Sequence, residues 1–520
     1  MKKKILFSVV LAFFKATIFF AQDIASEQRA VNIAVPNHIY NTNPFTASYT
    51  SEAQLFTGLH EGLFSYDPVT LAPLPALCKS YKISRDKKRW TLTLRENAKF
   101  SNGESIKAQD VRDSFIRLLG TRGAPFASLI DNVSGAQEFR EGYGKAEDVK
   151  IDVRNDYTIV IRLKEPMGHL PKILCHHSFS IVHPDENVYS GPFILEKIDM
   201  SEIILKKNPE YWDADNVKIP GINFTVSDDY PENSFKFNTG KLDWICGNAD
   251  YSKIINKTHL QMNAEFGTVY LFFKMQNSPW TNPEFRNALI EAIPYDTLRK
   301  EYTIQAESLV NPLTGYPKVT GIADWDASDA AEMMKGARKK YGISQDEKLT
   351  LVFAVISGDE HLKKWGELLK EAWEPLGVEL VMQNTTPDRY NLAIPQWNAD
   401  LFYYSWIGDF ADPLAFLELF RGGSSLNNSG WKNESYDNLL LEALRNNSIE
   451  ERYKLMSQAE QILLDDGMII PISHPVCAHL IDLSVIGGWK GNALDIHPLK
   501  YLYIKEPPKK KIPNLVKHSL

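Results

Sequence analysis

Alternating apolar and polar positions predict a chain built from both strands and helices. Residues 90–95 and 158–163 alternate strictly, which is typical of half-buried strands. Between them, apolar residues recur at i, i+4, i+7 and i+8 from Val111, the spacing of one helix face. The same patterns predict strands at 30–35, 349–355, 378–382 and 400–407, short strands after 190, and helices at 52–64, 283–293, 361–373, 414–420, 434–444 and 450–464. Strands and helices alternate over short connections, which indicates the α/β class.

The aromatic run from Phe402 to Trp406 is the most informative stretch, because it ends near two acids. The run predicts a buried strand, which Gly408 and Asp409 follow. Asp412-Pro413 is a turn signal, so Asp409 lies where the strand leaves the core. A carboxylate there can hold one cationic group through charge-assisted hydrogen bonds, worth about 1.5–3 kcal/mol. We predict that Asp409 binds a cation, with helix capping as its alternative role, and that Asp412 caps the next helix.

Length and composition favour a soluble protein of several domains. The 520 residues exceed what one hydrophobic core usually serves, so two or three domains are expected. The chain is 44% hydrophobic and 24% charged, as globular proteins are. Its net charge is −7 and its body carries no basic stripe, which argues against nucleic acid as a partner.

The N-terminal segment has the pattern of a secretory signal. Three lysines precede the largely apolar stretch 5–14, which is short for a membrane span. We predict a signal peptide at 1–21 and a soluble protein exported to the periplasm, with an uncleaved anchor as the alternative. No cysteine lies near Ala21, so a lipoprotein is not expected. The last residues, 507–520, predict a flexible basic tail.

Catalytic and metal-binding motifs are weak. The chain lacks GxSxG, HExxH and a glycine-rich phosphate loop, so we predict that it is not an enzyme. Cys175-His176-His177 with His183 is one suggestive metal-binding cluster, but adjacent histidines on a strand point to opposite faces. We therefore predict no metal and no cofactor. The four cysteines are far apart and predict buried free thiols: Cys78, Cys175, Cys246 and Cys477.

Five blocks in order along the chain resemble one known family, the oligopeptide-binding proteins of ABC peptide importers (bacterial extracytoplasmic solute-binding proteins of family 5). Together the blocks run from about Ile33 to about Ile504, nearly the whole mature chain. They are 90–111, 191–212, 285–293, 402–439 and 459–472, with Trp90 to Glu104 similar to the family's signature region.

This resemblance implies a two-lobed, three-domain periplasmic-binding-protein fold with mixed sheets and a hinge between the lobes. Domain I would comprise 25–65, 190–270 and 485–506, domain II would be 66–189, and domain III would be 271–484. The implied function is a monomeric extracytoplasmic receptor that captures short peptides and delivers them to the permease subunits of an ABC transporter.

The resemblance also implies a peptide site. Asp409 would hold the peptide's α-ammonium. The backbone of Ser405 and Ile407, and the segment from Ser48 to Thr50, would pair with the peptide main chain as an added strand. Side chains of the peptide would lie in roomy, water-filled pockets.

Further side chains are expected around that site. Trp406, next to Asp409, and Tyr403 would line the cleft. His361 matches a histidine that family members use near the peptide C-terminus. Phe126 stands near a position where the family has an aromatic hydroxyl, so that hydrogen bond would be missing.

The expected carboxylate end departs from the family. Two arginine positions of enteric members align with Ile394 and Tyr403, neither of which can pair with a carboxylate. Alternative ligands for the same fold are a murein peptide, nickel or haem. A secreted chaperone or adhesin is the remaining alternative.

Overall fold

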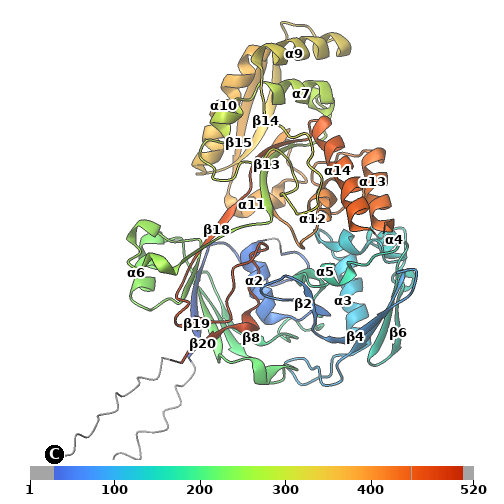
Figure 1. The fold of residues 1–520 in the computed structure, drawn as a ribbon, viewed down its shortest axis with the longest axis vertical. Helices are drawn as coiled ribbons and strands as arrows, with labels where there is room; N and C mark the ends of the chain where they lie inside the picture. The colour runs from blue at the N-terminus through green and yellow to red at the C-terminus, as the bar shows by residue number, and fades with distance from the viewer. Residues whose placement is uncertain (1–28, 48, 447, 507–520) are drawn as a thin grey trace, which may run out of the picture.

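The computed structural model of the protein describes residues 29–506, apart from residues 48 and 447 and the side chain of Asp388. The predicted signal peptide, the predicted basic tail and Ser48 lie outside the described residues. The chain forms two lobes (Figure 1). The larger lobe comprises 29–264 and 476–506, and the smaller lobe comprises 267–473.

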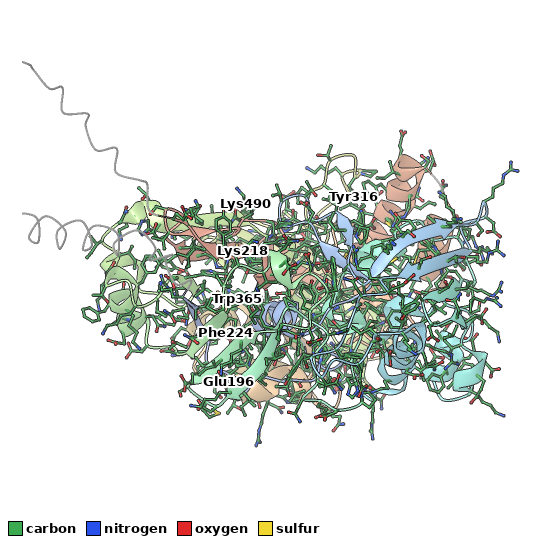
Figure 2. The ribbon with its side chains drawn as sticks, turned by 90° about the horizontal axis from the view of Figure 1, so that it is seen from below. Glu196, Lys218, Phe224, Tyr316, Trp365 and Lys490 are labelled. Carbon is green, nitrogen blue, oxygen red and sulfur yellow. The ribbon has the colours of Figure 1, made fainter. Side chains whose placement is uncertain are left out.

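A seven-stranded mixed sheet forms the centre of the larger lobe, in the order β12-β18-β11-β1-β10-β9-β8. The central strand β1 pairs in parallel with β10 and β11. Helix α2 (Thr50–Leu59) packs Leu55 and Leu59 against it, in one core with Phe224 (labelled in Figure 2). The strands are β1 (Val31–Val35), β8 (Phe193–Ile198), β9 (Glu202–Lys207), β10 (Gly221–Val226), β11 (Trp244–Cys246), β12 (Leu260–Ala264) and β18 (Val476–Ile481); α6 (Tyr230–Asn238) lies between β10 and β11 in sequence.

A four-stranded antiparallel sheet forms the rest of the larger lobe, in the order β4-β5-β7-β6. Trp90 and Leu92 of β5 face the core, where the buried face of α3 (Ala108–Gly120) presents Val111 and Phe115. The strands are β4 (Cys78–Ile83), β5 (Arg89–Leu94), β6 (Ile151–Asn155) and β7 (Thr158–Arg162); a small ladder joins β2 (Phe64–Tyr66) to β3 (Pro73–Pro75).

The smaller lobe contains a five-stranded sheet in the order β15-β14-β16-β13-β17. Its central strand is the aromatic run, β16 (Leu401–Ile407). The other strands are β13 (Gly267–Phe273), β14 (Leu349–Ile356), β15 (Val378–Thr385) and β17 (Ile469–Ser473). The main helices of this lobe are α7 (Pro283–Glu291), α9 (Ala327–Tyr341), α10 (Glu360–Trp373), α11 (Pro387–Ala393), α12 (Leu414–Leu417), α13 (Glu434–Arg445) and α14 (Ile449–Asp465) (Figure 1).

Two adjacent connections join the lobes. β12 continues into β13, and β17 continues back into β18. The N–H of Glu265 donates to the Pro475 carbonyl at 3.0 Å, so the two connections lie side by side. Although β18 falls within 271–484, it pairs with β11 and β12 of the larger lobe. A double connection of this kind serves as a hinge.

The predicted α/β fold with two lobes and mixed sheets is confirmed by this architecture. The predicted helix at 52–64 was wrong at both ends: α2 begins at Thr50 and ends at Leu59, because His60 is extended and Phe64 starts β2. Among the described residues, no helix combines the length and apolar character needed to span a bilayer.

Candidate functional site

A cleft of about 1170 Å³ lies between the lobes. Its walls come from α2, from the loop around His176 and from β18 in the larger lobe, and from the second half of β16 in the smaller lobe. Polar contacts across the lobes border it, including the Tyr66 hydroxyl, which donates to the Asp409 carbonyl at 2.9 Å.

Asp409 carries a buried carboxyl group at the end of β16. Its side chain is 6% exposed, and its Oδ2 has no hydrogen-bond partner among the described residues. Oδ1 lies 3.5 Å from Nε2 of His176, beyond a good hydrogen bond. Burial raises the pKa of the Asp409 carboxyl well above its usual value. None of the described residues therefore neutralises the negative charge that this acid carries when ionised.

Three histidines of the larger lobe line the cleft on the side facing Asp409. Burial lowers the pKa of His60 to about 3 and that of His177 to about 4, and it also lowers the pKa of His176 well below its usual value. Nδ1 of His60 and Nε2 of His177 lack hydrogen-bond partners within the described part of the chain. Because these rings are neutral, they supply no positive charge to Asp409.

The backbone of β16 presents a free edge to the cleft. β14 pairs with Leu401 and Phe402 and then separates from β16. The hydroxyl of Tyr390 occupies the gap: it accepts the Tyr403 N–H at 2.9 Å and lies 3.1 and 3.3 Å from the carbonyl oxygens of Tyr403 and Ala354. The two strands are thereby held apart beyond this point.

The unpaired edge begins beyond that hydroxyl. On the other side of β16, Gly408 donates its N–H to Phe266, next to β13, at 2.8 Å. Because antiparallel ladders alternate, the backbone groups of Ser405 and Ile407 point away from β13, toward the cleft. Two residues of β16 therefore offer main-chain donors and acceptors there.

Most side chains singled out from the sequence meet in this cleft. Of the nine residues, seven line it: Asp409, Trp406, Ser405, Ile407, Tyr403, Phe126 and Thr50. Trp406 is fixed by donating its indole N–H to the Ala415 carbonyl at 2.9 Å. Phe126 packs against His176 with the ring centroids 4.2 Å apart and the planes tilted by 51°. Thr50 is the first residue of α2 rather than part of an extended segment.

His361 does not join them. It lies on α10 with a side chain that is 61% exposed, and its Nδ1 faces Glu301 at 3.6 Å. Ile394, expected from the resemblance to align with an arginine of enteric members, is fully buried. Asp412 has the capping role predicted for it, since it accepts the N–H of Leu414 at 3.1 Å, and Arg452 neutralises it at 2.7 Å.

The cleft is acidic. Among the described residues that line it, Lys500 is the one lysine or arginine, and it is already paired with Glu61 at 3.2 Å. Carboxyl groups of Asp409, Glu265 and Asp495 also face the cleft. Burial, with a smaller contribution from Asp495, raises the pKa of Glu265 to about 8. The wall thus favours cationic over anionic groups of a ligand.

Sequence reasoning missed several cleft residues. His60, His176, His177, Tyr66 and Tyr404 all line it. The first four belong to segments more than 200 residues from Asp409, and no local sequence pattern predicts that they lie near it in the fold. The cluster suggested from sequence does not assemble, because His183 faces Glu104 at 3.2 Å on the surface. The four cysteines are free, as predicted, but only Cys78 and Cys175 are buried, and Cys246 and Cys477 are half-buried.

The sequence is similar to that of known solute-binding proteins. Residues 72–428 match the profile of the bacterial extracellular solute-binding proteins, family 5 (middle region). The dipeptide-binding protein DppE of Bacillus subtilis is 26% identical over 83% of this chain and 83% of its own length.

Solved structures share the fold. The murein tripeptide binding protein MppA of Escherichia coli superposes with a TM-score of 0.82 at 22% identity, over 92% of this chain and 99% of that one. OppA of Haemophilus influenzae, in complex with the peptide RPPGFSPFR, superposes with a TM-score of 0.82 at 21% identity, over 92% and 99% of the two chains.

Proposed function

Because the chain belongs to the bacterial extracellular solute-binding proteins of family 5, we propose that it binds short peptides in the interlobe cleft and delivers them to the permease of an ABC importer. The names of its relatives support this substrate class: a dipeptide-binding protein, a murein tripeptide binding protein and an OppA in complex with a nine-residue peptide. The receptor would act outside the cytoplasm as a monomer. Binding, not catalysis, is its role.

The uncompensated carboxyl of Asp409 is the observation that carries the proposal. A buried carboxylate needs a cationic partner, and none of the described cleft residues supplies one. The α-ammonium of a peptide provides both the charge and donors for Oδ1 and Oδ2. His176, at 3.5 Å from Oδ1, limits the space on the other side of the carboxyl group.

The free edge of β16 supports recognition of the peptide main chain. Ser405 and Ile407 would exchange hydrogen bonds with an extended peptide, as in strand addition. Main chain and amino terminus are common to all peptides, so this pair of contacts accepts many sequences. Trp406, Tyr403 and Phe126 would surround the first side chains without binding a specific polar group.

The proposal extends to Thr50, His361 and the division into domains. Thr50 could contribute a backbone N–H from the first turn of α2, where intrahelical partners are missing. A role for His361 at the peptide C-terminus requires the ligand to reach α10. The three-domain division is retained, with the hinge at Glu265 and Pro475 and β18 assigned to domain I.

A pair of modified peptides tests the proposal by titration calorimetry. Acetylation of the peptide N-terminus, or the change Asp409→Asn, should weaken binding by about 10- to 100-fold, since one charge-assisted contact is worth about 1.5–3 kcal/mol. Amidation of the C-terminus should change affinity little, because the described residues of the cleft include no unpaired lysine or arginine for a carboxylate.

Asp400→Asn is the matched control. Asp400 is a buried acid at the other end of β16, where its Oδ2 accepts the Val352 N–H at 2.9 Å, and it does not line the cleft. This variant should bind as the unmodified protein does. Equal affinity of acetylated and free peptides would refute the proposed anchor.

A further inference from the structure

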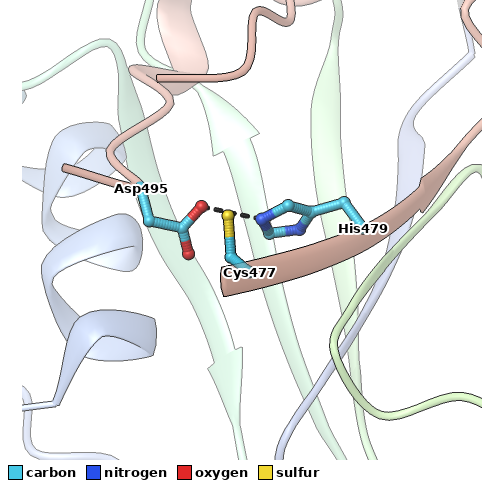
Figure 3. A group of neighbouring side chains, drawn as sticks. All are labelled: Cys477, His479 and Asp495. Atoms are coloured by element: carbon cyan, nitrogen blue, oxygen red, sulfur yellow. Dashed lines mark hydrogen bonds and ion pairs between the residues drawn. The ribbon is translucent and has the colours of Figure 1, made fainter. Parts of the chain in front are cut away.

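Thiol, imidazole and carboxylate groups cluster in the cleft wall where β18 enters the seven-stranded sheet. Cys477 and His479 lie two residues apart on one face of β18, and Asp495 approaches from a later loop (Figure 3). One ligand-type atom from each of these three side chains lies within 4.8 Å of the other two. His497 and Cys246 border the same part of the cleft, with Cys246 directly opposite His479 on β11.

Hydrogen bonding assigns His479 a supporting position. Its Nδ1 accepts the indole N–H of Trp244 at 3.1 Å, so the neutral ring carries its proton on Nε2. That Nε2–H then donates to Oδ1 of Asp495 at 2.7 Å. His479 therefore orients the carboxylate of Asp495 and has no free electron pair of its own.

His497 has the opposite arrangement. Its Nδ1 lies 2.8 Å from the Lys490 carbonyl, which can only accept, so Nδ1 carries the proton. Its Nε2 lies 3.0 Å from the same Asp495 oxygen and is the ring nitrogen that can turn to an ion. A cation between this nitrogen and Asp495 would be bound by both. Histidines that bind metals commonly donate their other N–H to a backbone carbonyl.

We propose that Cys477, Asp495 and His497 form a binding site for one divalent cation of the zinc class, with His479 as a positioning residue. The donors are one sulfur, one oxygen and one nitrogen, a set that suits Zn²⁺ and is poor for Mg²⁺ or Ca²⁺. Binding replaces the thiol proton of Cys477, which passes to solvent. A fourth ligand, Cys246 or water from the cleft, would complete the coordination.

The acidity of this wall favours such an ion. Asp495 contacts the two imidazoles, His479 at 2.7 Å and His497 at 3.0 Å, and pairs with no lysine or arginine among the described residues. Glu265 of the hinge also faces this region of the cleft. The site is separate from Asp409, so it goes beyond the proposed peptide anchor.

Titration of chelator-treated, thiol-reduced protein with Zn²⁺ alone tests the site by calorimetry. The expected result is one ion per chain. Co²⁺ as a substitute should give a thiolate-to-metal charge-transfer band. Cys477→Ser should abolish that band, and His497→Gln should weaken Zn²⁺ binding at least tenfold. His479→Gln should weaken it by about 10- to 100-fold and retain the band, as expected of a positioning residue.

Two matched variants complete the design. Cys78→Ser removes a buried thiol of β4 outside the cleft and should bind Zn²⁺ normally. Asp409→Asn should also retain Zn²⁺ binding, so failure of the peptide proposal and failure of this one are distinguishable.

Three results would overturn the inference. The first is no stoichiometric Zn²⁺ binding, in which case a proton fills the space between Asp495 and His497. The second is unchanged affinity in both Cys477→Ser and His497→Gln, which would mean an adventitious ion. The third is a Co²⁺ complex of the unaltered protein without a thiolate band, a readout that requires no variant to fold.

Discussion

At the scale of single residues, Asp409 lowers the stability of the ligand-free protein. Its carboxyl is buried with no cation from the described residues beside it, and burial raises its pKa well above the unfolded value. A group with a raised pKa stabilises the fold fully below its unfolded pKa, about 4, and loses that contribution as pH rises through the folded pKa. The ligand-free protein should therefore be less stable at neutral pH because of this acid.

Asp409→Asn should raise the melting temperature of the ligand-free protein at pH 7 and leave it nearly unchanged at pH 4. The amide stays neutral at both values, whereas the acid is neutral only at the lower one. Scanning calorimetry at the two pH values measures the difference. A variant that melts below the unmodified protein at pH 7 would contradict this account.

The sequence pointed to Asp409 because its position at the end of an aromatic strand is a local property. It could not supply His176, which lies beside the carboxyl group of Asp409, or Tyr66, which binds its backbone carbonyl, because both reach Asp409 only where the two lobes meet. His361 shows the converse limit. A match in an aligned position puts it on α10, but its side chain faces Glu301 instead of the cleft.

At the scale of elements, the hydroxyl of Tyr390 keeps β14 and β16 apart. It satisfies the backbone of Tyr403 in place of a neighbouring strand. The ring is buried, with 2% exposed. The open edge of β16 therefore depends on one side chain of α11.

Tyr390→Phe should destabilise the protein by about 1–3 kcal/mol, because a buried N–H loses its acceptor. Peptide affinity should also fall, since nothing then holds the edge of β16 open. Urea unfolding and calorimetric titration measure the two effects. Tyr341→Phe, which removes an exposed hydroxyl bonded to Glu284, is the control and should change stability by less than about 0.5 kcal/mol. Unaltered peptide affinity in Tyr390→Phe would refute the spacer role.

Strongly patterned elements were predictable. Strict alternation located β5 and β7, and the apolar face of α3 followed from its spacing. Helix α9 was missed because its buried face is mostly small, with Ala330, Met334 and Ala337, and so it carries a weak apolar signal. The end of α2 was misplaced because Leu63 and Phe64 extend the apolar pattern into the next segment.

At the scale of the molecule, polar contacts hold the lobes together on the side away from the hinge. Arg140 donates to the Gly423 carbonyl at 2.9 Å, Ser425 donates to the Pro125 carbonyl at 2.6 Å, and Arg445 pairs with Glu165 at 2.8 Å. Their partners come from different lobes, so each is broken when the cleft opens.

Arg445→Ala should accelerate peptide release by up to about fivefold, since an exposed ion pair contributes about 0.2–1 kcal/mol. Stopped-flow displacement of a labelled peptide measures the rate, and the difference should shrink at high salt. Lys340→Ala removes an ion pair with Glu284 inside the smaller lobe and should leave release unchanged. Equal release rates for Arg445→Ala and the unmodified protein would show that this contact plays no part in closure.

Because the two connections at Glu265 and Pro475 lie side by side, the two ends of the cleft move by different amounts when it opens. Atoms near a rotation axis travel least, so Cys477, two residues beyond Pro475, keeps its surroundings whether the lobes are parted or not. Asp409 meets His176 and Tyr66 across the divide and exchanges them for water when the lobes part. Contact with water would let the Asp409 carboxyl ionise before a ligand binds. Closure of the lobes would then be favourable when a ligand ammonium pairs with the carboxylate, and unfavourable when the carboxylate has to lose its water without a partner.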